Sequence, residues 1–288
     1  MSLQSFVFFI SMLFCLFPIR EAAGEQIELP IPVFVSIAPQ ATFVRAIGGK
    51  RVQVEVLVRP GASPATYAPT PKQLARLARA KLFFRIGVPF ESALVKRIHS
   101  SMPGLGIVDI SGVVSKLAIG SHGHGEDEEL DPHTWMDPML VKKEAAIIAS
   151  SLSGIDPAGK PFYEENYRAF AGKLDALDAR IRRILKPVQG RTVLVYHPAY
   201  GYFCRAYGLH QKAIESGGKT PGAQHLARLI TEAKREHIRA ILIQPQFSRK
   251  KASLLARAIG AEVIVADPLA ADYMENLEQL ARKLATIL

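Results

Sequence analysis

The densest group of side chains able to do chemistry lies near the middle of the chain, where residues 121–137 read SHGHGEDEELDPHTWMD. The first ten of these residues include two histidines, His122 and His124, and four acidic residues, and His133 follows closely. Imidazole nitrogen and carboxylate oxygen suit first-row divalent ions such as zinc. The composition predicts an exposed loop able to bind metal, and a solvated acidic loop fits it equally well.

Strand-like and helix-like runs alternate in two separate blocks of the chain, before and after a long helical tract. In the first block the predicted strands are 33–37, 52–58, 82–86 and 106–110, with helices at 38–48, 71–80 and 91–100. In the second block the predicted strands are 192–196, 209–214, 240–244 and 262–266, with helices at 201–206, 222–236, 248–259 and 274–287. This alternation predicts an α/β fold with parallel sheets covered by helices on both faces.

The tract between the blocks carries an apolar stripe at spacings of three and four over residues 159–185. About 25 helical residues would span roughly 37 Å, enough to join two lobes as a stiff strut. We therefore predict an N-terminal lobe (25–158), a linking helix (159–187) and a C-terminal lobe (188–288). An ordinary surface helix within one domain is the alternative.

The N-terminus reads as a secretory signal peptide rather than as part of the fold. Residues 6–17 form an apolar run too short to span a bilayer comfortably, and small residues end at Gly24, where we predict cleavage after residue 24. No Lys or Arg precedes the run, which is unusual for such a signal. After cleavage Cys204 is the only cysteine, so no internal disulfide can form and a core position is expected.

The formal net charge of +10 raises the question of an anionic partner. The basic residues are spread over many predicted helices, which favours solvated helix faces over a patch for nucleic acid or an anionic membrane. No nucleic-acid partner is expected.

Several motifs, taken in order, resemble one family: the zinc and manganese solute-binding proteins of ABC transporters (metal-binding cluster A-I). Residues 131–138 (DPHTWMDP) match its DPHxWxDP motif, and a His-rich loop precedes them as it often does in the family. Further similar segments run from about residue 32 to the C-terminus: 61–71 (GASPATYAPTP), 196–200 (YHPAY), 244–248 (QPQFS) and 267–269 (DPL).

This resemblance implies a class III periplasmic binding protein, in which two α/β lobes are joined by a long rigid helix. It implies a periplasmic, monomeric receptor that holds a divalent metal between its lobes, zinc favoured over manganese, and delivers it to an ABC permease in the inner membrane. Residue by residue, His133 and His197 match two of the family's ligands, and Asp267 matches the carboxylate ligand of many members.

The chain departs from the family pattern at its first ligand. The family's first histidine falls at Ala65 and its nearby glutamate at Ala68, and an alanine methyl group cannot coordinate a metal. Three outcomes remain open: water completes the site; a side chain completes it, either His122 or His124 swinging in or Glu215 donating; or the site no longer binds metal tightly. We expect a retained but altered metal site.

Two other functions fit parts of the sequence. A zinc hydrolase would use the open coordination position, but HExxH is absent and Glu129 is the nearest candidate base. An adhesin on the same fold is the other alternative, since fold does not fix function. We expect a binding protein and not an enzyme.

Overall fold

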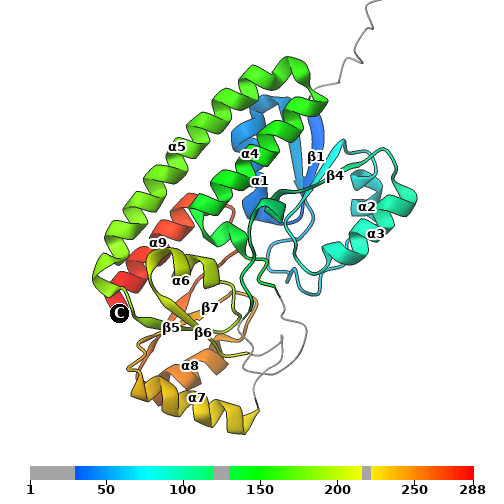
Figure 1. Cartoon of the computed structure of the whole chain (residues 1–288). Coiled ribbons are helices and arrows are strands. Elements are labelled where there is room, and N and C mark those ends of the chain that lie inside the picture. The colour runs from blue at the N-terminus through cyan, green and yellow to red at the C-terminus, as the bar shows by residue number, and fades with distance from the viewer. Residues whose placement is uncertain (1–29, 120–129, 216–221) are drawn as a thin grey trace, which may run out of the picture.

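The computed structural model describes residues 30–119, 130–215 and 222–288. The predicted signal peptide and the candidate residues His122, His124 and Glu129 lie outside these ranges. The described chain forms two lobes, each built around a four-stranded parallel sheet, with one long helix running along the side of both (Figure 1). The predicted fold class is thereby confirmed.

The N-terminal sheet has the strand order β2-β1-β3-β4, and every neighbouring pair is parallel. Its strands are β1 (Ile31–Val35), β2 (Val52–Val56), β3 (Leu82–Arg85) and β4 (Gly106–Asp109). The helices connecting them are α1 (Ala38–Gly48), α2 (Pro71–Leu77) and α3 (Glu91–Ser101). β1 is buried almost throughout, as expected for a central parallel strand.

The C-terminal sheet repeats this topology in the order β6-β5-β7-β8, again with parallel neighbours. Its strands are β5 (Thr192–Val195), β6 (His210–Ala213), β7 (Ala240–Ile243) and β8 (Glu262–Val265). Its helices are α6 (Gly201–Tyr207), α7 (Ala223–Arg235), α8 (Arg249–Ile259) and α9 (Tyr273–Ile287). The strand order reverses between β5 and β7, where open α/β sheets commonly bind ligands.

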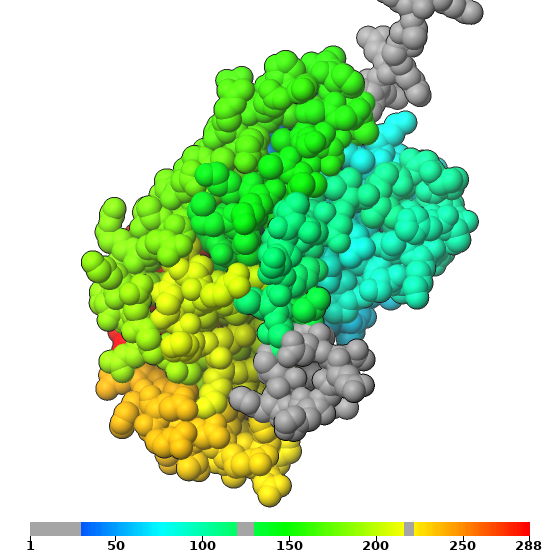
Figure 2. Space-filling model, in the orientation of Figure 1, coloured from blue at the N-terminus to red at the C-terminus, as the bar shows by residue number. Residues whose placement is uncertain are grey.

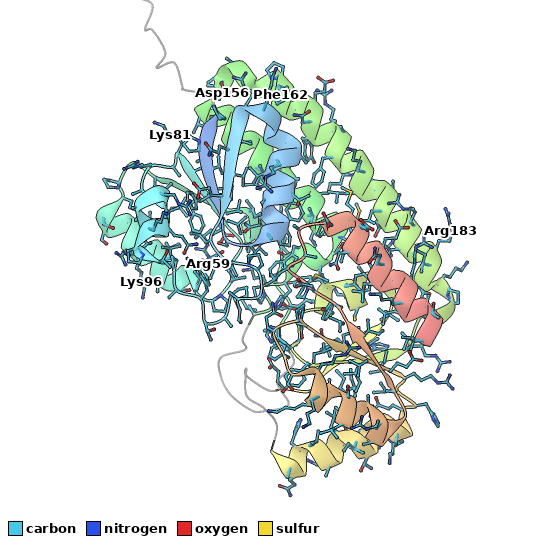
Figure 3. The ribbon with its side chains drawn as sticks, turned by 180° about the vertical axis from the view of Figure 1, so that it is seen from behind. Arg59, Lys81, Lys96, Asp156, Phe162 and Arg183 are labelled. Carbon is cyan, nitrogen blue, oxygen red and sulfur yellow. The ribbon has the colours of Figure 1, made fainter. Side chains whose placement is uncertain are left out.

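The linking helix α5 (Lys160–Leu185) has 26 residues and buries the predicted apolar stripe, including Phe170, Leu174 and Ile181. Its start is fixed by Asp156, whose Oδ2 accepts hydrogen bonds from Tyr163 (2.6 Å) and Arg51 (2.7 Å) at the end of the molecule labelled in Figure 3. Although burial opposes it, the hydrogen bonds from Tyr163 and Arg51 lower the pKa of Asp156, so this carboxylate stays ionised.

Helix α4 (Pro138–Ile155) is not among the helices predicted from the sequence. Its own signals are present: Asp137 caps it by accepting a 2.8 Å hydrogen bond from the Met139 amide, and Pro138 occupies its first position. Its apolar stripe of Val141, Ala145 and further residues packs along α5. α4 thus completes a helical layer behind both the N-terminal sheet and the predicted metal motif.

The larger of two hydrophobic clusters among the described residues runs through both lobes. Phe43 of α1 meets Tyr273 of α9 edge to face at 4.9 Å between ring centroids, and the Thr42 hydroxyl donates a 2.7 Å bond to the carbonyl oxygen of Ala271. α9 therefore starts against the N-terminal lobe and runs back along α5 (Figure 1). Because α9 packs on elements of both lobes, the predicted domain boundaries stay a prediction.

Cys204 is buried in this shared core, as expected from the sequence. Burial raises the pKa of its thiol to about 12, so the group stays protonated and behaves as a small apolar side chain. None of the helices in the described ranges combines the length and apolar character needed to cross a bilayer.

Candidate metal centre

His133 lies at the start of a short 3-10 turn (Thr134–Met136) and is nearly buried. Its Nδ1 atom is 2.7 Å from Oδ1 of Asp131, and the same oxygen accepts a 2.9 Å hydrogen bond from the His133 amide. A carboxylate beside Nδ1 favours the tautomer with its proton there. The lone pair of His133 is then on Nε2, the atom that could bind a metal.

His197 follows β5 at the point where the strand order reverses. Its Nδ1 atom is hydrogen-bonded to Oε1 of Glu215, a buried carboxylate just after β6. Gln244, directly after β7, donates a 2.9 Å bond from Nε2 to the His197 carbonyl oxygen and accepts a 3.4 Å bond from its amide. Side chain and backbone of His197 are therefore both held in place.

The two imidazoles come together from the two lobes. The ring centroids of His133 and His197 are 5.2 Å apart with an interplanar angle of 72°. Trp135 packs beside His133 at 5.1 Å, and Phe247 stacks near His197 at 6.2 Å. Two histidines with carboxylate-bound Nδ1 atoms thus meet in a setting walled by aromatic rings.

Asp267 lies two residues beyond β8, in the loop that leads to α9. Its Oδ1 accepts a 2.9 Å hydrogen bond from the Leu269 amide, and its carbonyl oxygen accepts a 2.8 Å bond from Asn276. Within the described residues, no three His, Cys, Asp or Glu side chains are gathered closely enough to hold an ion. Asp267 therefore serves as a turn cap in this conformation, and its role as a ligand stays a prediction.

The segment at the missing first ligand keeps its backbone framework. Ala65 and Ala68 are exposed in the loop between β2 and α2. Tyr67 packs on Phe90 at 5.4 Å and donates a 2.9 Å hydrogen bond to Gln73, which also caps α2. The loop is thus anchored just after Ala65, a position that has no coordinating atom.

A buried acid lies under the turn that carries His133. The Oε1 atom of Glu144 accepts a 2.5 Å hydrogen bond from the Thr134 hydroxyl, and its Oε2 has no hydrogen-bond partner among the described residues. Burial raises the pKa of Glu144 to about 8, with Asp109 and Asp137 adding to the shift and Lys116 opposing it. Glu144 is therefore protonated near neutral pH and supports the turn as a neutral acid.

Asp131, Gln244 and Glu144 position the site but were not assigned that role from the sequence. Asp131 had a local signal, because an Asp side chain commonly accepts a hydrogen bond from the backbone amide two residues later, here that of His133. Gln244 acts across 47 positions and Glu144 across 10, and no spacing rule points to either of them.

Comparison with known proteins identifies the family of this chain. A family model described as zinc-uptake complex component A, periplasmic, matches residues 33–287. The high-affinity zinc uptake system protein ZnuA of Bacillus subtilis is 31% identical over 260 residues, which is 86% of this chain and 80% of that protein. A crystal structure of a ZnuA superposes with a TM-score of 0.83 at 37% identity, covering 89% of this chain and 98% of that one.

A laminin-binding protein of Streptococcus agalactiae, described as bifunctional with adhesin and metal-transporting activity, superposes with a TM-score of 0.79 at 24% identity. The match covers 89% of this chain and 98% of that chain. At this identity the likeness establishes the fold alone.

Proposed function

This chain belongs to the family of periplasmic zinc-uptake complex A components, and we propose that it captures a divalent metal ion, zinc first, and delivers it to an ABC permease. Manganese is the second candidate, because two imidazoles and a carboxylate suit several first-row ions and geometry selects among them. The metal is the protein's cargo rather than a resident cofactor.

The meeting of His133 and His197 is the observation that carries this proposal. Each imidazole has a carboxylate at Nδ1, so both are arranged to offer Nε2. Outer carboxylates of this kind fix the tautomer and raise the basicity of a metal-binding histidine. A carboxylate at Nδ1 of each histidine is expected for metal ligands, whereas histidines of a hydrophobic core do not need one.

Asp267 is the proposed third ligand. Its loop is bonded to the turn that carries His133, because Trp135 donates to the Pro268 carbonyl oxygen. A rotation of the Asp267 side chain away from the Leu269 amide would free the carboxylate for an ion. Water, His122, His124 or Glu215 would then supply the fourth position that Ala65 leaves vacant.

The site with Ala65 should therefore bind zinc more weakly than a four-ligand site. Glu215 is already engaged with His197, so we favour its role as a positioning carboxylate over that of a ligand. The proposed cellular setting is the periplasm, after removal of residues 1–24, with a monomeric receptor that meets its permease at the inner membrane.

Zinc titration of residues 25–288 tests this proposal, since these residues include every described element. His133→Ala and His197→Ala should each weaken zinc binding at least tenfold, consistent with the loss of one of very few ligands. His99→Ala, an exposed histidine on α3, is the matched control and should bind like the parent chain. Equal affinities in all four proteins would refute the assignment.

The family is one of transport proteins, and we propose no catalytic role for this chain. The hydrolase alternative requires a general base, and its candidate Glu129 has no observation in its favour. Metal-dependent ester or peptide turnover by the zinc-loaded chain, abolished in His133→Ala, would reverse this conclusion.

A further inference from the structure

The outer surface of the C-terminal lobe gathers basic residues that are spread out along the sequence. α7 carries three of them and α8 four, against a single acid, Glu232; the seven are Arg228, Lys234, Arg235, Arg249, Lys250, Lys251 and Arg257. The two helices pack on each other and cover the end of this lobe that is far from the N-terminal lobe (Figures 1 and 2). We call this surface the α7–α8 face.

Ion pairs among the described residues do not explain these charges. Within the described residues, Arg235 alone among the seven has a recorded salt bridge, at 3.7 Å to Glu236. Glu232 and Glu236 both bind Lys212, at 2.8 and 3.0 Å. Arg249, Lys250 and Lys251 occupy the first turn of α8, where the helix dipole disfavours cations. The face therefore gains little folding stability from its charge and is suited to an external anionic partner.

An exposed leucine lies among these cations. Leu254 keeps 53% of its surface exposed, four residues after Lys250 and three before Arg257, so the three side chains form one stripe on α8. A cationic helix surface with an apolar centre fits a bilayer interface, where the apolar group enters the headgroup region. Nucleic acid would offer Leu254 no apolar environment of this kind.

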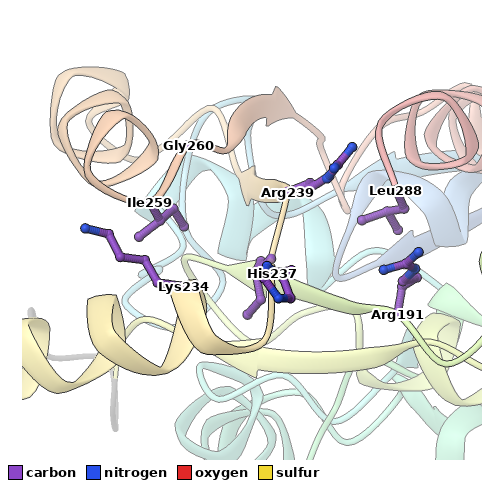
Figure 4. Close-up of a pocket in the computed structure, with 8 residues that line it drawn as sticks. Arg191, Lys234, His237, Arg239, Ile259, Gly260 and Leu288 are labelled. Carbon is purple, nitrogen blue, oxygen red and sulfur yellow. The ribbon is translucent and has the colours of Figure 1, made fainter.

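A basic pocket of about 400 Å³ adjoins the C-terminal ends of the two helices (Figure 4). Its lining includes Lys234, His237, Arg239 and Arg191, with Ile259 from the last turn of α8. His237 has a φ of 51°, a left-handed conformation that non-glycine residues rarely adopt after a helix. The pocket is large enough for a phosphate group and offers it several cationic partners.

We propose that the α7–α8 face binds the surface of an anionic phospholipid membrane, with Leu254 in the headgroup region and the pocket receiving a lipid phosphate. Phe247, directly before the cap residue of α8, stacks near His197, so the α7–α8 face adjoins the metal centre at the start of α8, but its action does not depend on a bound metal. It would hold the receptor close to the bilayer that contains its permease.

Co-sedimentation of residues 25–288 with lipid vesicles tests the proposal, because the removed segment contains the apolar run 6–17. Binding should be far stronger to phosphatidylcholine vesicles that contain phosphatidylglycerol than to pure phosphatidylcholine, and added salt should weaken it. The double variant Lys250→Gln/Arg257→Gln should lose about 25-fold in the partition coefficient, at roughly fivefold per cation. Leu254→Ser should lose several-fold.

The matched control is Lys96→Gln/Arg97→Gln, two exposed cations of α3 on the other lobe, where Figure 3 labels Lys96. It removes the same net charge and should bind like the parent chain. Equal losses in the two double variants, or equal binding to both vesicle types, would overturn the proposal. A third result would also overturn it: Leu254→Ser binds vesicles like the parent chain, and a heparin column ranks the variants in the same order as the vesicles do. The face would then recognise polyanions in general.

The outcome is independent of the metal assignment. Vesicle binding should be the same in His133→Ala and in the parent chain treated with a chelator. If the metal proposal failed, the membrane proposal would therefore be unaffected. If the membrane proposal failed, the metal proposal would likewise be unaffected.

Discussion

The indole nitrogen of Trp135 donates a 2.7 Å hydrogen bond to the carbonyl oxygen of Pro268. Trp135 lies two residues after His133, and Pro268 directly follows Asp267, so the bond joins the loops that carry two proposed ligands from different lobes. Tyr273 adds a second link by donating a 2.8 Å bond to the Trp135 carbonyl oxygen. The relative position of these loops is therefore set by the protein itself.

Trp135→Phe should lower both stability and zinc affinity. The variant keeps an aromatic ring but leaves the Pro268 carbonyl oxygen without its donor, which costs about 1–3 kcal/mol for a buried group. The Asp267 loop should then be less well held, and zinc affinity should fall several-fold. Urea unfolding followed by circular dichroism and a zinc titration measure the two effects; parent-like values in both would contradict this account.

Ala65→His should tighten zinc binding at least tenfold, because it restores a nitrogen donor at the family's first ligand position. The loop is already anchored through Tyr67, so little new ordering is required. Thr66→His places the same side chain one residue away and serves as the control. If both variants bind alike, position 65 does not face the metal.

Two substitutions at Glu215 separate a positioning role from a ligand role. Glu215→Gln can still accept the Nδ1 proton of His197 and should keep zinc affinity within a few-fold of the parent chain, whereas Glu215→Ala should lose about 10- to 100-fold. A coordinating carboxylate would make the two losses similar and large. Competition with a chromophoric chelator provides the affinities.

Glu144→Gln should change how stability depends on pH. The pKa of Glu144 is about 8 in the folded chain against an ordinary value of 4.5, so between these values the folded state binds a proton that the unfolded state has lost. Its contribution is complete below about pH 4.5 and is lost as the pH rises toward 8. The facing groups Asp109, Asp137, Lys116 and Thr134 remain in both proteins.

The parent chain should therefore lose stability relative to Glu144→Gln between pH 5 and pH 8, by an amount on the order of a few kcal/mol, since one pKa unit is worth ~1.4 kcal/mol. Urea unfolding at several pH values gives the difference directly. Parallel stability profiles for the two proteins would show that Glu144 does not titrate in this range.

Much of the fold could be predicted from residue patterns. Period-two and apolar runs located all eight described strands, and the stripe on 159–185 located α5 almost to the residue. Helix α4 was not predicted, although Asp137, Pro138 and the later apolar stripe are ordinary helix signals. The order of strands, by contrast, follows from tertiary pairing, and local sequence does not contain it.

The site was predictable only in part. The approach of His133 and His197 followed from family resemblance, and the structure brings their rings together. The supporting contacts of Gln244 and Glu144 depend on residues 47 and 10 positions away, respectively, whose meeting only the folded chain reveals. The clustering of cations on α7 and α8 could not be predicted for the same reason. The basic residues are spread evenly along the sequence, and the sequence does not show which helices become neighbours.

One hydrophobic core shared by both lobes has a mechanical consequence. A wide hinge movement would expose that core to water, at a free-energy cost in proportion to the apolar area uncovered. The metal should therefore enter and leave through small displacements of the loops that carry the proposed ligands, while the two lobes keep their relative positions. We expect X-ray scattering to give the same radius of gyration with and without zinc. The permease must then distinguish a loaded receptor by direct contact with these loops rather than by the overall shape of the protein.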